Sequence, residues 1–480
     1  MGKYLFVVLF FLVQHSLFSQ LFLKNPTKQA GPSLPILLNH ADSLVGKDTP
    51  SGALTYLLGN VSLTQGNVQV TCNEAIQNNS LNTVILKGNV VITQGSGRIF
   101  SPYVEYYGNS GIAISPNGIR LQDEKSVLTA KYGEYSTQSY IAYFKDSVLI
   151  VDPKSVIESK FTKYNRKTKN SIATGFVIFE TDSAVLYSDS LFYSPSQKVS
   201  SAFGQILLAS KFSSSQLEGD SIFYNLSNQS SVVMGYPNAM YVDTTQKATN
   251  SVQDTLYVTG DTLYATRFEE FDEIKVHGNA SAIRSTFNSI SDSLHIITFQ
   301  RNDTMVSKFI GRPIIWYDST QLTGDSIISI TKENELRTIE SFRNAFLLSK
   351  SNSKYLDRVD QVEGDTITIN FSNQQIQTIY ADGNAQSLYY SYEEDVADGN
   401  AKNFADEIEI QFIENKPDLI NWKGGIRGEY FPEKFVEGKV NSFNLPRFQI
   451  RTDKPKKYYF RSKYLPYHYS RPFKKNSSTN

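Results

Sequence analysis

One phrase occurs twice near the N-terminus and constrains the fold more than any other feature of this chain. It reads Leu-x-Gly-Asn-Val-x-(apolar)-Thr-Gln-Gly, and it stands at Leu57–Gly66 and again, 29 residues later, at Leu86–Gly95. In each copy apolar and polar residues alternate, which is typical of a β-strand with one buried face. Gly-Asn tolerates unusual backbone angles and predicts a bulge within the strand, and Gln-Gly predicts the turn that ends it.

A second phrase, Asp followed by Ser or Thr and an apolar residue, recurs along most of the chain. Its copies begin at Asp42, Asp189, Asp220, Asp261, Asp292, Asp325 and Asp365, with a degenerate copy at Asp406. By phase alone, the same slot is filled by Asn73, Pro102, Lys131 and Lys160. The steps between slots are 29 to 41 residues, which indicates a stacked repeat architecture. No segment has the pattern of a long amphipathic helix, so we expect an all-β fold.

The repeats suggest a division of the chain. We expect β repeats at 51–242 and 255–412, with a break in the loop 243–254 between them. A loose lead-in is expected at 21–50 and an irregular basic tail at 413–480. From Arg451 onward there are nine basic residues against one acidic residue, Asp453. This tail is either a solvated segment or a contact for a phosphorylated or membrane partner.

The N-terminus has the features of an export signal. Lys3 precedes the apolar run Tyr4–Val13, and the segment Ser16–Gln20, which contains the small residues Ser16 and Ser19, follows as the exit from that run. We therefore expect residues 1–20 to be a secretory signal peptide. The alternative, a membrane anchor, needs a longer apolar run, because about 20 residues are required to span a bilayer.

Composition and motifs exclude several classes of function. Lys+Arg and Asp+Glu are equal at 47 each, so charge does not indicate a nucleic-acid partner. The chain carries no nucleophile elbow, phosphate loop or dinucleotide fingerprint, and its histidines have no metal-ligand spacing. We expect no enzymatic activity, no metal and no cofactor. The one cysteine, Cys72, excludes an intramolecular disulfide and is interpreted as a small core residue.

The repeated aspartates allow three interpretations. The first is structural: each carboxylate accepts hydrogen bonds from nearby backbone N–H groups and fixes the turn into the strand. Calcium-binding β-rolls also repeat aspartate, but they place several acidic and glycine residues in each nine-residue period. The phrase also resembles an O-glycosylation acceptor of some exported bacterial proteins.

The paired phrases resemble the OstA/LptA family of lipopolysaccharide-transport proteins. The resemblance is carried by Gly59–Val61, Thr71–Glu74 and Gly88–Gly95, and it is best between Leu54 and about Tyr135. The later Gly-Asn-Ala and Gly-Asp-Ser-Ile phrases resemble further strands of the same family. This chain is more than twice as long as the family's short bridge protein, so an extended OstA-like protein is the better description.

The resemblance implies an elongated, open β-jellyroll, a β-taco-like stack of about 30–40-residue repeats whose two sheets enclose an apolar groove. We take apolar positions to face inward and polar positions outward. The residues that would then contact lipid are Val61, Leu63, Val68, Val70, Val84, Leu86, Val90 and Ile92. The structural alternative is that these side chains only pack against one another.

The resemblance also implies a function and partners. The protein would be a periplasmic component of outer-membrane biogenesis that binds and transports lipopolysaccharide, with outer-membrane association as an option. Partners would be lipopolysaccharide, other transport modules joined end to end by β-augmentation, and the outer-membrane translocon. Two other classes stay open: a structural or adhesive secreted β-solenoid without lipid transport, and a carbohydrate-active β-helix enzyme, which would need clustered carboxylates.

Overall fold

A computed structural model describes residues 36–50, 52–122, 125–242, 255–285, 287–299, 301, 303–333, 335–350, 352, 354–413 and 416–470. The expected signal peptide and the candidate break at 243–254 lie outside these residues. The described chain divides into two compact units. The N-terminal unit comprises 36–212, Asp220–Asn228 and 462–470, and the C-terminal unit comprises Ser213–Gly219 and Gln229–Arg461, with the gaps given above. The division therefore begins at Ser213, before the expected loop.

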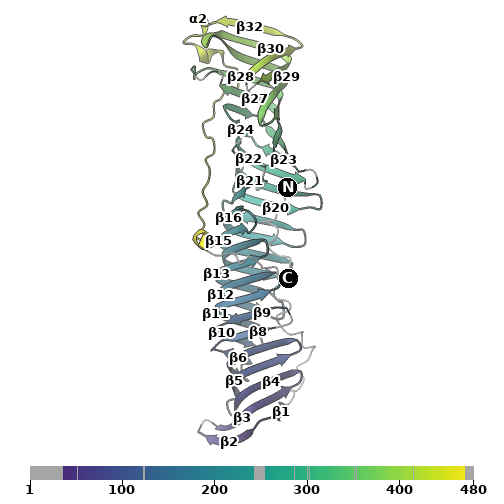
Figure 1. Ribbon diagram of the computed structural model, residues 1–480, viewed down its shortest axis with the longest axis vertical. Coiled ribbons are helices and arrows are strands. Elements are labelled where there is room, and N and C mark those ends of the chain that lie inside the picture. The colour runs from purple at the N-terminus through teal and green to yellow at the C-terminus, as the bar shows by residue number, and fades with distance from the viewer. Residues whose placement is uncertain are drawn as a thin grey trace. The chain divides into compact units, whose positions relative to one another are not determined.

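The N-terminal unit is built from antiparallel strands that pair mostly with their neighbours in sequence (Figure 1). Its strands are β1 (Leu37–His40), β2 (Ser43–Thr49), β3 (Gly52–Gln65), β4 (Val68–Asn78), β5 (Thr83–Gln94), β6 (Gly97–Tyr107), β7 (Ile112–Ser115), β8 (Ile119–Gln122), β9 (Val127–Ala130), β10 (Tyr132–Ser136), β11 (Ile141–Asp152), β12 (Ser155–Asn165), β13 (Ser171–Thr181), β14 (Ala184–Ser194) and β15 (Val199–Ser210). Strand β16 (Gln216–Asn225) has residues in both units.

Three short helical segments follow the last described strand, the first two in the C-terminal unit and the third in the N-terminal unit. The C-terminal unit continues the same plan of antiparallel strands. Its strands are β17 (Ser230–Met234), β18 (Asn238–Val242), β19 (Thr255–Thr259), β20 (Thr262–Arg267), β21 (Phe271–Ile283), β22 (Phe287–Phe299), β23 (Thr304–Ile310), β24 (Ile314–Tyr317), β25 (Thr320–Thr323), β26 (Ser326–Lys332), β27 (Glu335–Lys350), β28 (Val359–Ser372), β29 (Gln375–Glu393), β30 (Val396–Ile413), β31 (Lys416–Lys423) and β32 (Arg427–Pro432). The helical segments are α2 (Glu433–Val436), η1 (Val440–Phe443) and α3 (Leu465–Ser470).

The all-β prediction is confirmed, and so are the predicted bulges. The register between β3 and β4 shifts between Leu58 and Val61, and the register between β5 and β6 shifts between Lys87 and Val90. Asn60 lies within the first shift at φ 48°. The repeated Gly-Asn pair therefore marks the point where each long strand bends.

The Asp phrase and the Gly-Asn phrase are two halves of one contact. Asn60 Nδ2 donates to Asp42 Oδ2 at 3.0 Å, and the Asp42 backbone N–H donates to the Gly59 carbonyl at 3.0 Å. Equivalent side-chain bonds join Asn279 to Asp261, Asn344 to Asp325 and Asn384 to Asp365. The aspartate therefore helps to fix the strand, as expected, and the side-chain partner seen in these four pairs is the amide of the neighbouring bulge.

Both regions expected to be irregular contain strands. Part of the lead-in forms β1 and β2, which pair with β3, and the start of the tail forms β31 and β32, which pair with β30. Beyond these strands, Val436, Val440 and Leu445 of the tail are buried against the sheet of the C-terminal unit. None of the described helices is long and apolar enough to cross a membrane.

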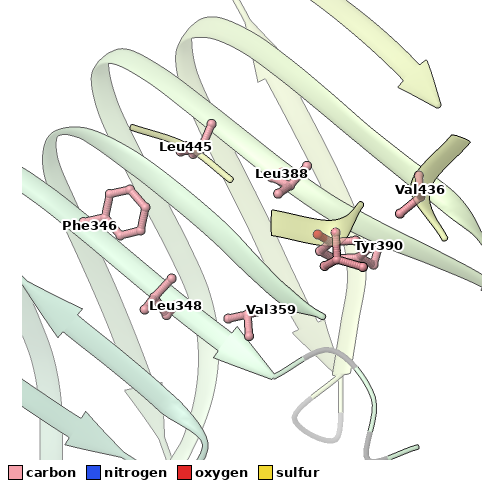
Figure 2. Close-up of a cluster of buried hydrophobic side chains, with 8 residues drawn as sticks. Phe346, Leu348, Val359, Leu388, Tyr390, Val436 and Leu445 are labelled. Atoms are coloured by element: carbon pink, nitrogen blue, oxygen red, sulfur yellow. The ribbon is translucent and has the colours of Figure 1, made fainter. Parts of the chain in front are cut away.

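The packed part of the tail forms a cluster on the face opposite the one expected to be apolar (Figure 2). Leu348 pairs with Gln361, and Gln361 pairs with Leu388, so these three side chains share one face. By the repeat, Ala345 corresponds to Val61, and Ala345 lies on the other face. We call the face of Val61 and its equivalents the inner face, and the opposite face the outer face.

Apolar side chains of β27, β28 and β29 meet the tail on this outer face. The cluster comprises Phe346, Leu348, Val359, Leu388, Tyr390, Val436, Val440 and Leu445, and we call it the tail cluster. Two side-chain contacts to the tail flank it: Arg358 Nη1 donates to Glu433 Oε2 at 2.7 Å, and Gln361 Nε2 donates to Asn444 Oδ1 at 2.6 Å. The assumption that outward positions are polar is wrong here, because the tail covers them.

Candidate functional site

The candidate site is the inner face of strands β3 to β6 in the N-terminal unit. A cluster of buried side chains lies there, and we call it the inner-face cluster: Val61, Cys72, Ala75, Leu86, Val90 and Val104. Partly buried side chains pack against it: Ala41, Leu57, Leu63, Val70, Val84 and Ile92. Strand register explains the gathering, because Leu57, Ala75, Leu86 and Val104 are directly paired across the four strands.

Most of the residues predicted to line a lipid groove are brought together in this cluster. Val61, Leu86 and Val90 belong to its buried core, and Leu63, Val70, Val84 and Ile92 pack against it. Val68, the first residue of β4, is not part of the cluster. The sequence analysis did not name Ala75 or Val104, although both lie at alternating positions of strands and could have been found from that pattern.

The degree of burial differs between positions of the inner face. Val61 and Val90, which directly follow the bulges, are each 1% exposed. Leu63 and Ile92, two residues further along their strands, are only partly buried. The strand ends beyond the bulges therefore present apolar surface that a ligand can still remove from water.

The same inner face is more completely filled further along the N-terminal unit. Phe144 and Phe179 are each 3% exposed, and Ile157 and Tyr164 are each 1% exposed. Phe179 occupies the position, two residues after its bulge, that Leu63 and Ile92 hold in β3 and β5.

The chemistry of the cluster is that of an apolar surface. Burial raises the pKa of the Cys72 thiol to about 11, so the thiol stays protonated and unreactive near neutral pH. Cys72 is free and buried, which confirms its interpretation as a core residue. Among the described residues, no group of three or more His, Cys, Asp or Glu side chains could hold a metal ion.

The outer face of the same strands is polar by comparison. Glu74 pairs with Lys87 across β4 and β5, and their carboxylate and ammonium groups lie 3.5 Å apart. On β5, Val91 points to the outer face between Val90 and Ile92, which point to the inner face. Neighbouring residues of one strand therefore provide matched inner and outer probes.

The edge strands of this unit are also exposed. Strands β1 and β2 both pair with β3, one on each half of its length. Their apolar side chains Leu37, Leu38, Leu44 and Val45 are 45% to 60% exposed. An exposed edge with apolar side chains is a typical site for the addition of a strand from another chain.

These features define a class: all-β repeat proteins whose long, bulged antiparallel strands share an apolar inner face. Residues 34–175, which include the whole candidate site, match the model of the OstA-like protein family. The predicted resemblance to OstA/LptA-like proteins is thus confirmed for this part of the chain.

The solved structures include a similar protein. It is LptH from Pseudomonas aeruginosa, the LptA homologous periplasmic component of the lipopolysaccharide transport device. The identity is 15%, the match covers 30% of this chain and 83% of LptH, and the TM-score is 0.16. No curated protein gives a match.

Proposed function

We propose that this protein binds lipopolysaccharide and carries it through the periplasm as a component of outer-membrane biogenesis. The observation that carries the proposal is the gathering of seven of the eight predicted groove residues in or against the inner-face cluster. That cluster lies within the OstA-like residues 34–175. In this proposal the protein acts as a binding and transport component and not as an enzyme.

The binding energy would come from acyl chains laid against the inner face. Burying apolar surface contributes roughly 25 cal/mol per Å², or about 0.8 kcal/mol for each methylene group. Leu63, Val70 and Ile92 are partly buried and still expose surface that an acyl chain could cover. Val61 and Val90 would instead form the floor beneath the chain.

The exposed edge at β1 and β2 supports a second part of the proposal. Leu44 and Val45 of β2 are 60% and 46% exposed, and their strand pairs with β3 on one side. Another transport module could add a strand here and continue the inner face from one protein to the next. The translocon of the outer membrane would be a partner of the same kind.

A matched pair of substitutions on β5 tests the lipid-binding face. Ile92 and Val91 are adjacent, both partly buried, and on opposite faces. The full chain would be titrated with fluorescent lipopolysaccharide. We expect Ile92→Asn to weaken binding at least tenfold and Val91→Asn to change it less than twofold. Equal effects, or no binding by the unsubstituted chain, would contradict the proposal.

A structural or adhesive β-solenoid is the alternative function. It is favoured by the near-complete burial of Val61 and Val90, since a filled interior needs no lipid. In that case neither Ile92→Asn nor Val91→Asn would affect lipopolysaccharide, because the unsubstituted protein would not bind it.

A further inference from the structure

The last described residues of the chain occupy a defined site on the N-terminal unit. Residues 462–470, which we call the latch, contain α3 and contact Asp189 at the bulge of β14. Lys463 Nζ donates to Asp189 Oδ1 and Oδ2 at 2.7 and 2.8 Å. The Tyr464 hydroxyl donates to Asp189 Oδ1 at 2.6 Å.

The repeat sequence changes at the point where the latch binds. Four aspartates of the Asp phrase accept a bond from the Asn of a neighbouring bulge, as Asp261 does from Asn279. The bulge beside Asp189 carries Gly204-Gln205 in place of Gly-Asn. The side-chain partners of Asp189 are instead Lys463 and Tyr464.

Aromatic rings complete the site. The Tyr464 ring lies 5.9 Å from the Tyr187 ring in a stacked arrangement and 5.5 Å from the Phe176 ring. Tyr467 lies 4.6 Å from Phe176, and the His468 ring lies edge-on to Tyr187 at 5.9 Å. Tyr464 is 1% exposed, so the latch places a large side chain fully in the site.

The site is on the outer face of the sheet. Tyr187 pairs with Ile178 and Leu207, so these three side chains share a face. Val177, which directly follows the bulge of β13, alternates with Ile178 and lies on the inner face. The latch therefore does not compete for the surface proposed to bind lipid, and its role is independent of the proposed function.

The electrostatics favour a charged carboxylate in contact with the latch. Burial would by itself raise the pKa of Asp189, but the hydrogen bonds from Lys463 and Tyr464 outweigh burial and lower it. Both charged side chains are about half exposed, at 52% for Asp189 and 48% for Lys463. An ion pair this exposed is weak and exchanges with solvent, whereas the buried Tyr464 gives the contact its specificity.

We propose that Asp189, Tyr187 and Phe176 form a peptide-docking site for a Lys-Tyr segment followed by aromatic residues, and that the chain's own residues 463–468 occupy it as a releasable latch. The ligand chemistry is a cation beside a tyrosine hydroxyl, with a second aromatic ring three or four residues later. Occupancy by the latch keeps the aromatic ring of Tyr187 out of water.

Peptide binding to the full chain tests this site. The probe is a fluorescent peptide of residues 461–470, and the receptor is the full chain with Lys463→Ala and Tyr464→Ala, whose own latch cannot dock. We expect this variant to bind the peptide at least tenfold more tightly than the unsubstituted chain, whose site is filled. Adding Asp189→Ala should remove the gain.

A matched control distinguishes loss of the docking site from a general effect of removing one aspartate of the repeat. Asp292 belongs to the same phrase but lies beside Gly311 in the C-terminal unit, so Asp292→Ala in the same variant should leave peptide binding unchanged. The docking site is ruled out if the latch variant binds the peptide no better than the unsubstituted chain, or if Asp189→Ala and Asp292→Ala have equal effects.

Proteolysis gives a second readout that does not depend on binding in trans. Trypsin cleaves after Lys463, and the docked latch should protect this bond. In the full chain, Asp189→Ala should accelerate this cleavage at least tenfold, while Asp292→Ala should leave the rate unchanged. Cleavage at the same rate in all three proteins would show that the latch is not held at Asp189.

Discussion

Asn279 Nδ2 donates to both carboxylate oxygens of Asp261, to Oδ1 at 3.3 Å and to Oδ2 at 3.2 Å. The two residues are 18 positions apart in the sequence. Asn279 itself has φ 50°, in the left-handed region that Asn tolerates better than most residues. The pair joins the start of one strand to the bulge of the next. The same relationship recurs at Asp42, Asp325 and Asp365, so one contact links the two repeated phrases at these positions.

This contact should be measurable as a coupling between the two residues. We expect Asn279→Ala and Asp261→Ala each to destabilise the C-terminal unit by about 0.5–1.5 kcal/mol, the usual contribution of one hydrogen bond. The double variant should cost less than the sum of the single variants. Urea unfolding of the four proteins gives this cycle, and strict additivity would mean that the bond does not stabilise the fold.

The glycine of the bulge is required for a second reason. Gly278 has φ +75°, and a Cβ atom there would lie 2.1 Å from Asp261 Oδ2. Gly278→Ala combines backbone strain with this clash and should cost about 2–4 kcal/mol. Gly95 is the matched control, because its φ is +62° but no atom lies within 4 Å of a Cβ there. Gly95→Ala should cost about 1 kcal/mol. Equal losses of unfolding free energy would contradict the clash.

The tail cluster makes the tail part of the folded core of its unit. Leu445 is 1% exposed, and its backbone N–H donates to Gln361 Oε1 at 2.8 Å. We expect Leu445→Ala to lower the free energy of unfolding by about 2–4 kcal/mol, as for other buried leucines. Ile450→Ala is the control, because Ile450 is 54% exposed, and it should change stability by less than about 0.5 kcal/mol. A tail that does not pack would give two equally small changes.

Asp360 gives the C-terminal unit a defined pH dependence. Burial raises the pKa of Asp360 to about 7, against the lesser effect of a hydrogen bond from the Tyr390 backbone N–H at 2.9 Å. Because the folded pKa is above the unfolded one, this residue's contribution is fully present below about pH 4 and is lost as the pH rises through 7.

Replacement of Asp360 tests the direction of this pH dependence of stability. Asp360→Asn removes the carboxylate that must ionise in a poorly solvated place, so it should stabilise the unit at pH 8 relative to the unsubstituted chain. The gain should shrink or vanish at pH 4, and each unit of pKa difference is worth about 1.4 kcal/mol. Urea titrations of both proteins at pH 4 and pH 8 give the change in the free energy of unfolding at each pH. An equal change at both pH values would contradict the raised pKa of Asp360.

The sequence predicted the strand pattern and the inner cluster because both depend on local alternation. The Gly-Asn bulges and the burial of Val61 and Val90 follow from positions that can be read along one strand. The same reasoning did not identify the partner of each Asp. Asp261 and Asn279 are brought together only by strand pairing, which no local pattern reveals.

The tail shows the opposite case, because its local sequence pattern predicted an irregular segment and did not reveal the residues that are buried. Residues such as Leu445 and Tyr464 stand in segments rich in Lys, Arg and Pro, without the periodicity of a strand or a long helix. Their partners, Leu388 and Tyr187, lie on an outer face that we expected to be polar. A segment that packs without regular structure leaves no period in the sequence, and its binding site is recognised only from the fold.

The central claim, that the inner face carries lipid, is tested most directly by photo-crosslinking in bacterial envelopes. A photoreactive residue would replace Val61, Val90 or Ile92 on the inner face, and Ser62 or Val91 on the outer face. Crosslinks to lipopolysaccharide from the inner positions alone are the predicted result. Crosslinks from both faces at equal yield, or from neither, would contradict the account.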